Sequence, residues 1–201
     1  MRETGFAAMV LVSLLSGCAA IPTVGAASRP LAAYDLSPLV ERTTWSPRGG
    51  YLLVEPPEAS GGLATDRIMI RPDPLAVQYL PAAKWVEDAP SLVQRLIVES
   101  FMASGEYQLV ALRDFGPNPD YVLVTDLTAF QTEATDAGFS VRVALVATLV
   151  RDRDRRILSS RAFEATRPAA SSAPIEVVRA FDEATGEALE RLRDWASEVA
   201  R

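Results

Sequence analysis

The pattern of hydrophobic and polar positions changes several times along this chain. Residues 51–55 are apolar almost without interruption, which predicts a strand buried on both faces. Two short apolar runs, 68–71 and 76–80, flank a Pro-Asp-Pro sequence and predict a hairpin. A further strand is predicted over 107–112.

Three longer strands are predicted over residues 121–131, 139–150 and 156–165. In the second of them every other residue is apolar, as expected for one buried face. The connections are short, so we expect these strands to pair antiparallel as a meander. The buried face of the second strand is expected to hold Phe139, Val141, Val143, Leu145, Ala147 and Leu149.

Two amphipathic helices complete the pattern. The first is predicted to begin at Ser91, a favourable N-cap, and to end at Gly105, which suits a left-handed C-terminal position. The second covers about 175–199. Together these elements predict an α+β fold: an antiparallel-rich β-sheet with two α-helices packed on one face. The apolar faces comprise Leu92, Val93, Leu96, Ile97 and Phe101 in the first helix and Val177, Val178, Phe181, Ala188, Leu192, Trp195 and Val199 in the second.

The N-terminus has the layout of a bacterial lipoprotein signal over residues 1–17. An arginine precedes a short apolar run, and Leu-Ser-Gly leads directly into Cys18, the only cysteine of the chain. We expect Cys18 to carry the lipid, residues 18–33 to form a flexible tether, and 34–201 to form a single domain. The alternative is an ordinary signal peptide with a chance cysteine. Ala19 is not the aspartate associated with inner-membrane retention, which favours the periplasmic face of the outer membrane.

The composition restricts the chemistry. The chain has no histidine, and its net charge is −6, so neither a Ser-His-Asp triad nor a histidine metal site can form, and nucleic acid is an unfavourable partner. With Cys18 lipidated, thiol catalysis is also removed, and no phosphate-binding glycine loop is present. We therefore predict no enzymatic activity, no catalytic residues, no metal and no cofactor. A carboxylate pair for glycoside hydrolysis is disfavoured but remains open.

Three residues are candidates for partner binding. Asp66 and Arg67 lead from a glycine-containing loop into a strand, where Arg67 can either bind a carboxylate or lipid phosphate or cover the sheet edge. In the second case, which the chemistry of these residues favours, Asp66 caps the loop. Trp85, beside mixed charges before the first helix, is either an interface anchor or a residue that closes the core. The charged sequence at 152–156 fits a solvated turn better than a calcium loop.

Several of these segments, in this order, resemble the ABC-type transport auxiliary lipoprotein family. The resemblance rests on the sequences at 34–38, 51–54, 65–71 and 84–90, on the strand at 120–131 and on the final helix, behind the lipoprotein signal. Its most specific parts are the Asp-Arg-Ile strand and the Trp-x-x-x-Pro sequence that precedes the first helix.

The resemblance implies an accessory role in transport. Members of the family are encoded with an ABC permease, an ATPase and a membrane-anchored MCE-domain protein that carries lipids across the periplasm. The implied function is the docking component of such a transporter, with a homo-oligomer as a further possibility. The alternative is an independent lipid-binding shuttle or chaperone that uses a groove beneath the C-terminal helix.

Overall fold

A computed structural model describes residues 30–39, 47, 49–112, 118–136 and 138–200. The chain divides into two compact units, Met1–Pro30 and Leu31–Arg201. The predicted signal, Cys18 and the tether up to residue 29 lie outside the described residues. The second unit therefore begins three residues before the predicted domain boundary at residue 34.

A mixed β-sheet forms the centre of this unit. The meander predicted from the sequence is present, because β8 (Tyr121–Thr135), β9 (Gly138–Arg151) and β10 (Arg156–Pro168) pair antiparallel in that order. On the other side of β8, strand β2 (Gly49–Val54) lies between β8 and β7 (Tyr107–Ala111) and runs parallel to both. This strand was predicted to be buried on both faces, and its residues from Tyr51 to Val54 are buried or half-buried.

The prediction of an antiparallel-rich sheet is only partly right, since three short strands run parallel to β8. Strand β2 pairs with its start, β3 (Glu58–Ala59) with its middle and β4 (Met69–Asp73) with its end. Strand β8 is 15 residues long, so one strand offers hydrogen bonds to three partners in succession. The sheet curls into a half-barrel.

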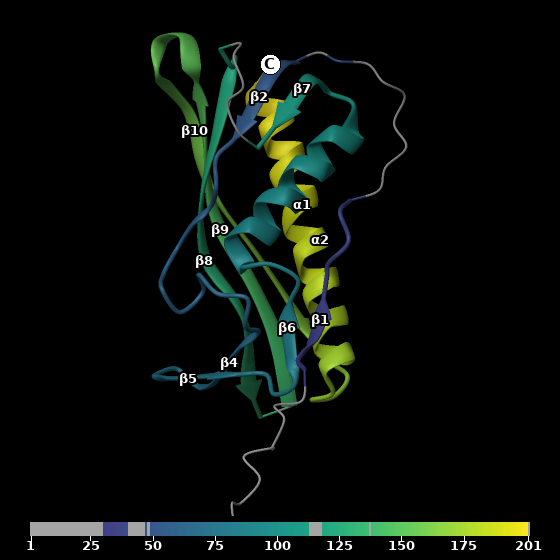
Figure 1. Ribbon diagram of the computed structural model, residues 1–201. Coiled ribbons are helices and arrows are strands. Elements are labelled where there is room, and N and C mark those ends of the chain that lie inside the picture. The colour runs from purple at the N-terminus through teal and green to yellow at the C-terminus, as the bar shows by residue number, and fades with distance from the viewer. Residues whose placement is uncertain (1–29, 40–46, 48, 113–117, 137, 201) are drawn as a thin grey trace, which may run out of the picture. The chain divides into compact units, whose positions relative to one another are not determined.

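A hairpin and a separate small sheet lie at one end of the unit (Figure 1). Strand β5 (Ala76–Tyr79) pairs antiparallel with β4, which confirms the predicted hairpin. Strands β1 (Ala32–Tyr34) and β6 (Ala83–Trp85) pair parallel as a two-stranded sheet. Strand β1 falls partly within the segment predicted to be tether.

Both helices cover the same face of the long strands, as predicted (Figure 1). Helix α1 (Ala89–Ser104) ends at Gly105, whose φ of 65° and ψ of 14° confirm the left-handed cap. Its N-cap is Asp88 instead of the predicted Ser91, because the Asp88 carboxylate accepts from the Ser91 backbone N–H. Helix α2 (Pro174–Val199) matches its prediction. Neither helix of the described chain has both the length and the apolar character to span a bilayer.

The predicted apolar faces form the core. Every residue predicted for the buried face of α1 is buried, as are those of α2 and β9 except Val199 and Phe139, which are half-buried. At the centre, Trp85 packs against Phe130 and Phe181, with ring centroids 5.5 and 5.1 Å away. This cluster joins β6, β8 and α2, so it ties the small sheet to the main one.

The charged turn between β9 and β10 is held by its own ion pairs. It forms a single 3-10 turn (Asp152–Asp154). Arg151 pairs with Asp154 at 2.8 Å, and Arg155 pairs with Asp152 at 3.4 Å. The carboxylates of the turn thus bind arginines, as expected of a solvated turn.

Candidate partner-binding surface

The structure brings Trp85 next to Asp66 and Arg67, although it follows Arg67 by 18 residues in the chain. The Trp85 backbone N–H donates to the Asp66 carbonyl at 2.7 Å, and the Asp66 carboxylate pairs with Lys84 at 2.9 Å. The residue before Asp66, Thr65, accepts from the Ala89 N–H at the start of α1. The loop before β4 is therefore fixed against both β6 and α1.

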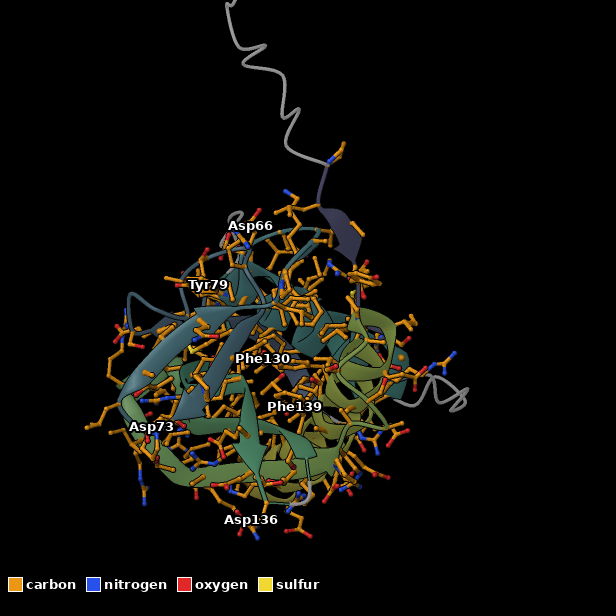
Figure 2. The ribbon with its side chains drawn as sticks, turned by 90° about the horizontal axis from the view of Figure 1, so that it is seen from below. Asp66, Asp73, Tyr79, Phe130, Asp136 and Phe139 are labelled. Atoms are coloured by element: carbon orange, nitrogen blue, oxygen red, sulfur yellow. The ribbon has the colours of Figure 1, made fainter. Side chains whose placement is uncertain are left out.

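Asp66 has a mainly structural set of contacts. Its backbone holds β6, and its side chain holds Lys84 at the surface. Both side chains are more than a third exposed, so this ion pair contributes at most about 1 kcal/mol to folding. The pair holds the Asp66 carboxylate at the surface of this end of the domain, where Asp66 and Tyr79 are labelled in Figure 2.

Trp85 is only 1% exposed and belongs to the core. Its indole contacts the aromatic rings of β8 and α2, as described above. The core-closing alternative therefore describes this side chain, which offers no surface to a partner. Trp85 contributes to the candidate surface only through its backbone N–H, which binds the Asp66 carbonyl and so supports the loop before β4.

Arg67 lies on the outer side of this loop and against the hairpin. Its guanidinium carbon is 5.6 Å from the ring centroid of Tyr79 on β5, within the range of a cation–π contact. Its Nε is buried without a hydrogen-bond partner, and no carboxylate pairs with it within the described chain. Arg67 is thus oriented by an aromatic ring while its charge is not neutralised by an acid.

The tip of the hairpin next to Arg67 is held by hydrogen bonds within the turn. The Asp73 carboxylate accepts from the Leu75 N–H at 2.9 Å, and the Arg71 guanidinium donates to the Pro74 carbonyl. Two prolines restrict the same turn. As a result Leu75 is held at the tip and is 95% exposed.

A polar cleft of about 320 Å³ opens behind the hairpin. Asp73 and Glu133 both line it, and glycoside hydrolysis needs two carboxylates that face each other across such a cleft. Asp73 caps the turn, while Glu133 accepts from Gln131 at 2.6 Å and pairs with Arg142 at 3.7 Å. Both carboxylates therefore have structural partners.

Arg142 also lines the cleft and is held by an acid on the neighbouring strand β10. It donates to both carboxylate oxygens of Glu164 on β10, at 2.8 and 3.1 Å. This hydrogen bonding lowers the pKa of Glu164 and raises the pKa of Arg142. Within the described ranges, no three His, Cys, Asp or Glu side chains are grouped so that they could hold a metal ion.

The sequence reasoning did not identify Tyr79, Leu75 or Lys84 as members of this surface. The alternation of Leu75, Val77 and Tyr79 was visible, but a buried strand gives the same pattern as an exposed one. Only the pairing shows that β5 has β4 as its sole described partner strand.

Comparison with known sequences agrees with this architecture. Residues 34–192 match the family described as the ABC-type transport auxiliary lipoprotein component. A protein of Bradyrhizobium diazoefficiens, named uncharacterized protein bll6063, is 30% identical over 149 residues, which is 72% of this chain. The chain spans 38% of the length of that relative.

Two solved structures share the fold. Protein XCC0632 from Xanthomonas campestris, assigned to the DUF330 family, is 26% identical and superposes with a TM-score of 0.75 over 84% of this chain and 96% of its own. The hypothetical protein CT253 from Chlamydia trachomatis is 9% identical, with a TM-score of 0.52 over 75% of this chain and 98% of its own. The second likeness concerns the fold alone.

Proposed function

The chain belongs to the family of ABC-type transport auxiliary lipoproteins, and on that basis we propose that it is the docking component of an MCE-type lipid transporter. In this proposal the protein lies on the periplasmic face of the outer membrane, to which it is anchored by the lipid on Cys18. Its partners in this proposal are an MCE-domain protein and the associated ABC permease. The observation that carries the proposal is the family match, which extends from the first strands into the last helix.

The anchor is the second part of the proposal. Cys18 follows Leu-Ser-Gly at the end of a short apolar run. Lipidation also explains why an exported protein has a single cysteine, which would otherwise be an unpaired reactive thiol. Several acyl chains on one residue hold a protein stably on a leaflet, whereas one chain binds only marginally. Ala19 after the cysteine supports the outer membrane as the destination.

Contacts to the partner surface are proposed for Asp66 and Arg67, with Trp85 supporting their loop from beneath. Arg67 is the best supported of these residues, because it is half-buried against Tyr79 and no acid of the described chain pairs with its guanidinium. A guanidinium can bind a carboxylate or a phosphate with two parallel hydrogen bonds.

The packing of α2 favours docking over the shuttle alternative. Phe181, Ala184, Ala188 and Leu192 of α2 are completely buried against the rest of the domain. A hollow between α2 and β10 measures about 210 Å³, below the 300–1,000 Å³ or so of typical sites for small ligands. This hollow is therefore too small to enclose a phospholipid with two acyl chains.

An affinity purification from crosslinked cell envelopes tests the docking function. We expect the tagged full-length protein to recover an MCE-domain protein and a permease, and Cys18→Ala to lose most of this recovery because the protein no longer reaches the membrane. Met102→Ala, on an exposed position of α1, serves as a matched control that retains recovery. Recovery of phospholipid without these proteins would contradict docking and favour the shuttle.

A further inference from the structure

The β4–β5 hairpin presents three apolar side chains to solvent. Leu75 at its tip is 95% exposed, and Val77 and Tyr79 on β5 are 48% and 38% exposed. They are spaced two residues apart, so Val77 and Tyr79 share one face of the strand and Leu75 extends that row to the tip. Single exposed apolar residues are common, but a row of three on one projecting element points to a binding surface.

Two arginines beside this row can bind a phosphate. Arg67 and Arg71 form no ion pair within the described chain, whereas Lys84 is paired with Asp66. Asp73 and Glu133 also lie beside the hairpin, so the charges at this end are mixed. Arg67 stacks on Tyr79, which places a cation and an aromatic ring just behind the apolar tip. Aromatic rings and arginines of this kind favour the headgroup level of a bilayer, with apolar side chains below them.

The chain enters the domain at this same end. The Ala32 N–H donates to the Ala82 carbonyl at 2.9 Å, and Ala82 is only three residues beyond Tyr79. Thirteen residue steps separate Cys18 from Leu31, so a lipid on Cys18 lies at most ~47 Å from the start of the domain, whatever the conformation between them. The hairpin and the point where the anchor pulls on the domain are therefore neighbours.

From these three observations we propose that the β4–β5 hairpin contacts the phospholipid leaflet in which the Cys18 lipid is inserted. Leu75 enters the boundary between headgroups and acyl chains, and Arg67 binds a headgroup phosphate while Tyr79 lies beside it. This inference rests on the lipid anchor of the proposed function. The contact fixes the orientation of the domain on the membrane and directs the opposite end of the long strands into the periplasm.

A fluorescent probe at residue 75 tests this contact. Because the sulfur of Cys18 is bonded to lipid in the mature protein, Leu75→Cys supplies a single thiol for labelling with a nitrobenzoxadiazole dye. The labelled, lipidated protein is placed in phosphatidylethanolamine vesicles with or without phosphatidylglycerol. Nitroxide groups on the acyl chains of added lipid then quench any probe that reaches the bilayer.

The matched control is Ile157→Cys, on an exposed apolar position of β10. Ile157 is level with Val150 and Val122, whereas β4 joins β8 at Gln131–Glu133, so the two probes are separated by about 30 Å along the strands. We expect quenching at residue 75 to exceed that at residue 157 several-fold. Arg67→Gln should reduce quenching at residue 75 more in vesicles that contain phosphatidylglycerol.

Flotation of the same samples separates the two proposals. If the protein floats with the vesicles but residue 75 is quenched no more than residue 157, the hairpin contact is overturned and the row is free for a protein partner. If the protein does not float at all, the lipid anchor itself is contradicted, and the hairpin contact is rejected with it. Strong quenching at both positions would show adsorption in mixed orientations and would also overturn the proposal.

Discussion

Trp85 connects three elements through one side chain. Its indole contacts Phe130 of β8 and Phe181 of α2, and the ring centroids of these two residues are themselves 4.9 Å apart. We expect Trp85→Ala to lower the free energy of unfolding by about 3–5 kcal/mol, since the large cavity cannot be filled by its neighbours. Urea unfolding measures the change. Trp85→Phe, which keeps a ring in the cluster, should cost clearly less, and equal losses would contradict this packing argument.

The sequence around Trp85 was consistent with both a surface anchor and a core residue. Mixed charges precede and follow it, and such a pattern occurs at interfaces and at helix starts alike. Burial depends on Phe130 and Phe181, which are 45 and 96 residues away in the chain. The contact of Arg67 could not be predicted either, because the ring that it contacts, Tyr79, is brought to it only by the folding of the β4–β5 hairpin.

At the scale of elements, the start of α1 is fixed by one carboxylate. Asp88 accepts from the Ser91 backbone N–H at 3.1 Å and from the Ser91 hydroxyl at 2.9 Å. Asp88→Ala should reduce the stability by about 1 kcal/mol, because the first turn loses a hydrogen-bond acceptor. Asp88→Ser retains an acceptor and should lose less than half as much. The midpoint of chemical unfolding reports both changes.

The pairing of β9 with β10 contains a pH-sensitive contact. The hydrogen bonds from Arg142 lower the pKa of Glu164 in the folded protein below its value in the unfolded chain. This contribution to stability is therefore present above the unfolded pKa of about 4.3 and is lost as the pH falls through the lower, folded pKa. In an NMR titration, Arg142→Gln should raise the pKa of Glu164 towards its ordinary value. An unchanged titration would show that the bidentate contact does not form in solution.

The elements whose apolar residues recur at a regular spacing were predictable from the sequence, whereas the pairing of the short strands was not. Helix α2 and the β8–β9–β10 meander follow directly from apolar spacing and short connections. Strands β2, β3 and β4 all attach to one edge of β8 in parallel, which requires crossovers that no local pattern specifies. The N-cap was misplaced because Asp88 and Ser91 are both good capping residues three positions apart.

At the scale of the whole molecule, the order of the segments identified the family, although each match was short. The candidate surface was found only in part, since Asp66 and Arg67 were visible as charges while the exposed row on β5 resembled a buried strand. The reason is physical: exposure is a property of the assembled sheet. Strand β5 is exposed because only β4 pairs with it in the described structure.

The boundary of the domain yields the last prediction. The segment 31–39 is held at several points: Leu36 is buried, Ser37 N–H donates to Asp182 of α2 at 2.7 Å, and Leu39 N–H donates to Ser100 of α1 at 3.1 Å. A chain that lacks residues 1–29 should therefore keep the stability of the mature protein. Removal of residues 1–39 should cost ~3 kcal/mol or more, from the lost burial of one leucine and the lost hydrogen bonds.

Urea unfolding of the two shortened chains compares them directly. Equal midpoints would show that the segment contributes nothing and that the domain starts at β2. A large difference means that the anchor pulls on a segment fixed to both helices, so a force on the lipid is transmitted to the whole domain. Strand β1 at the start of this segment pairs with β6, directly after the hairpin, so the same result would support a fixed distance between the hairpin and the point where the chain enters the domain.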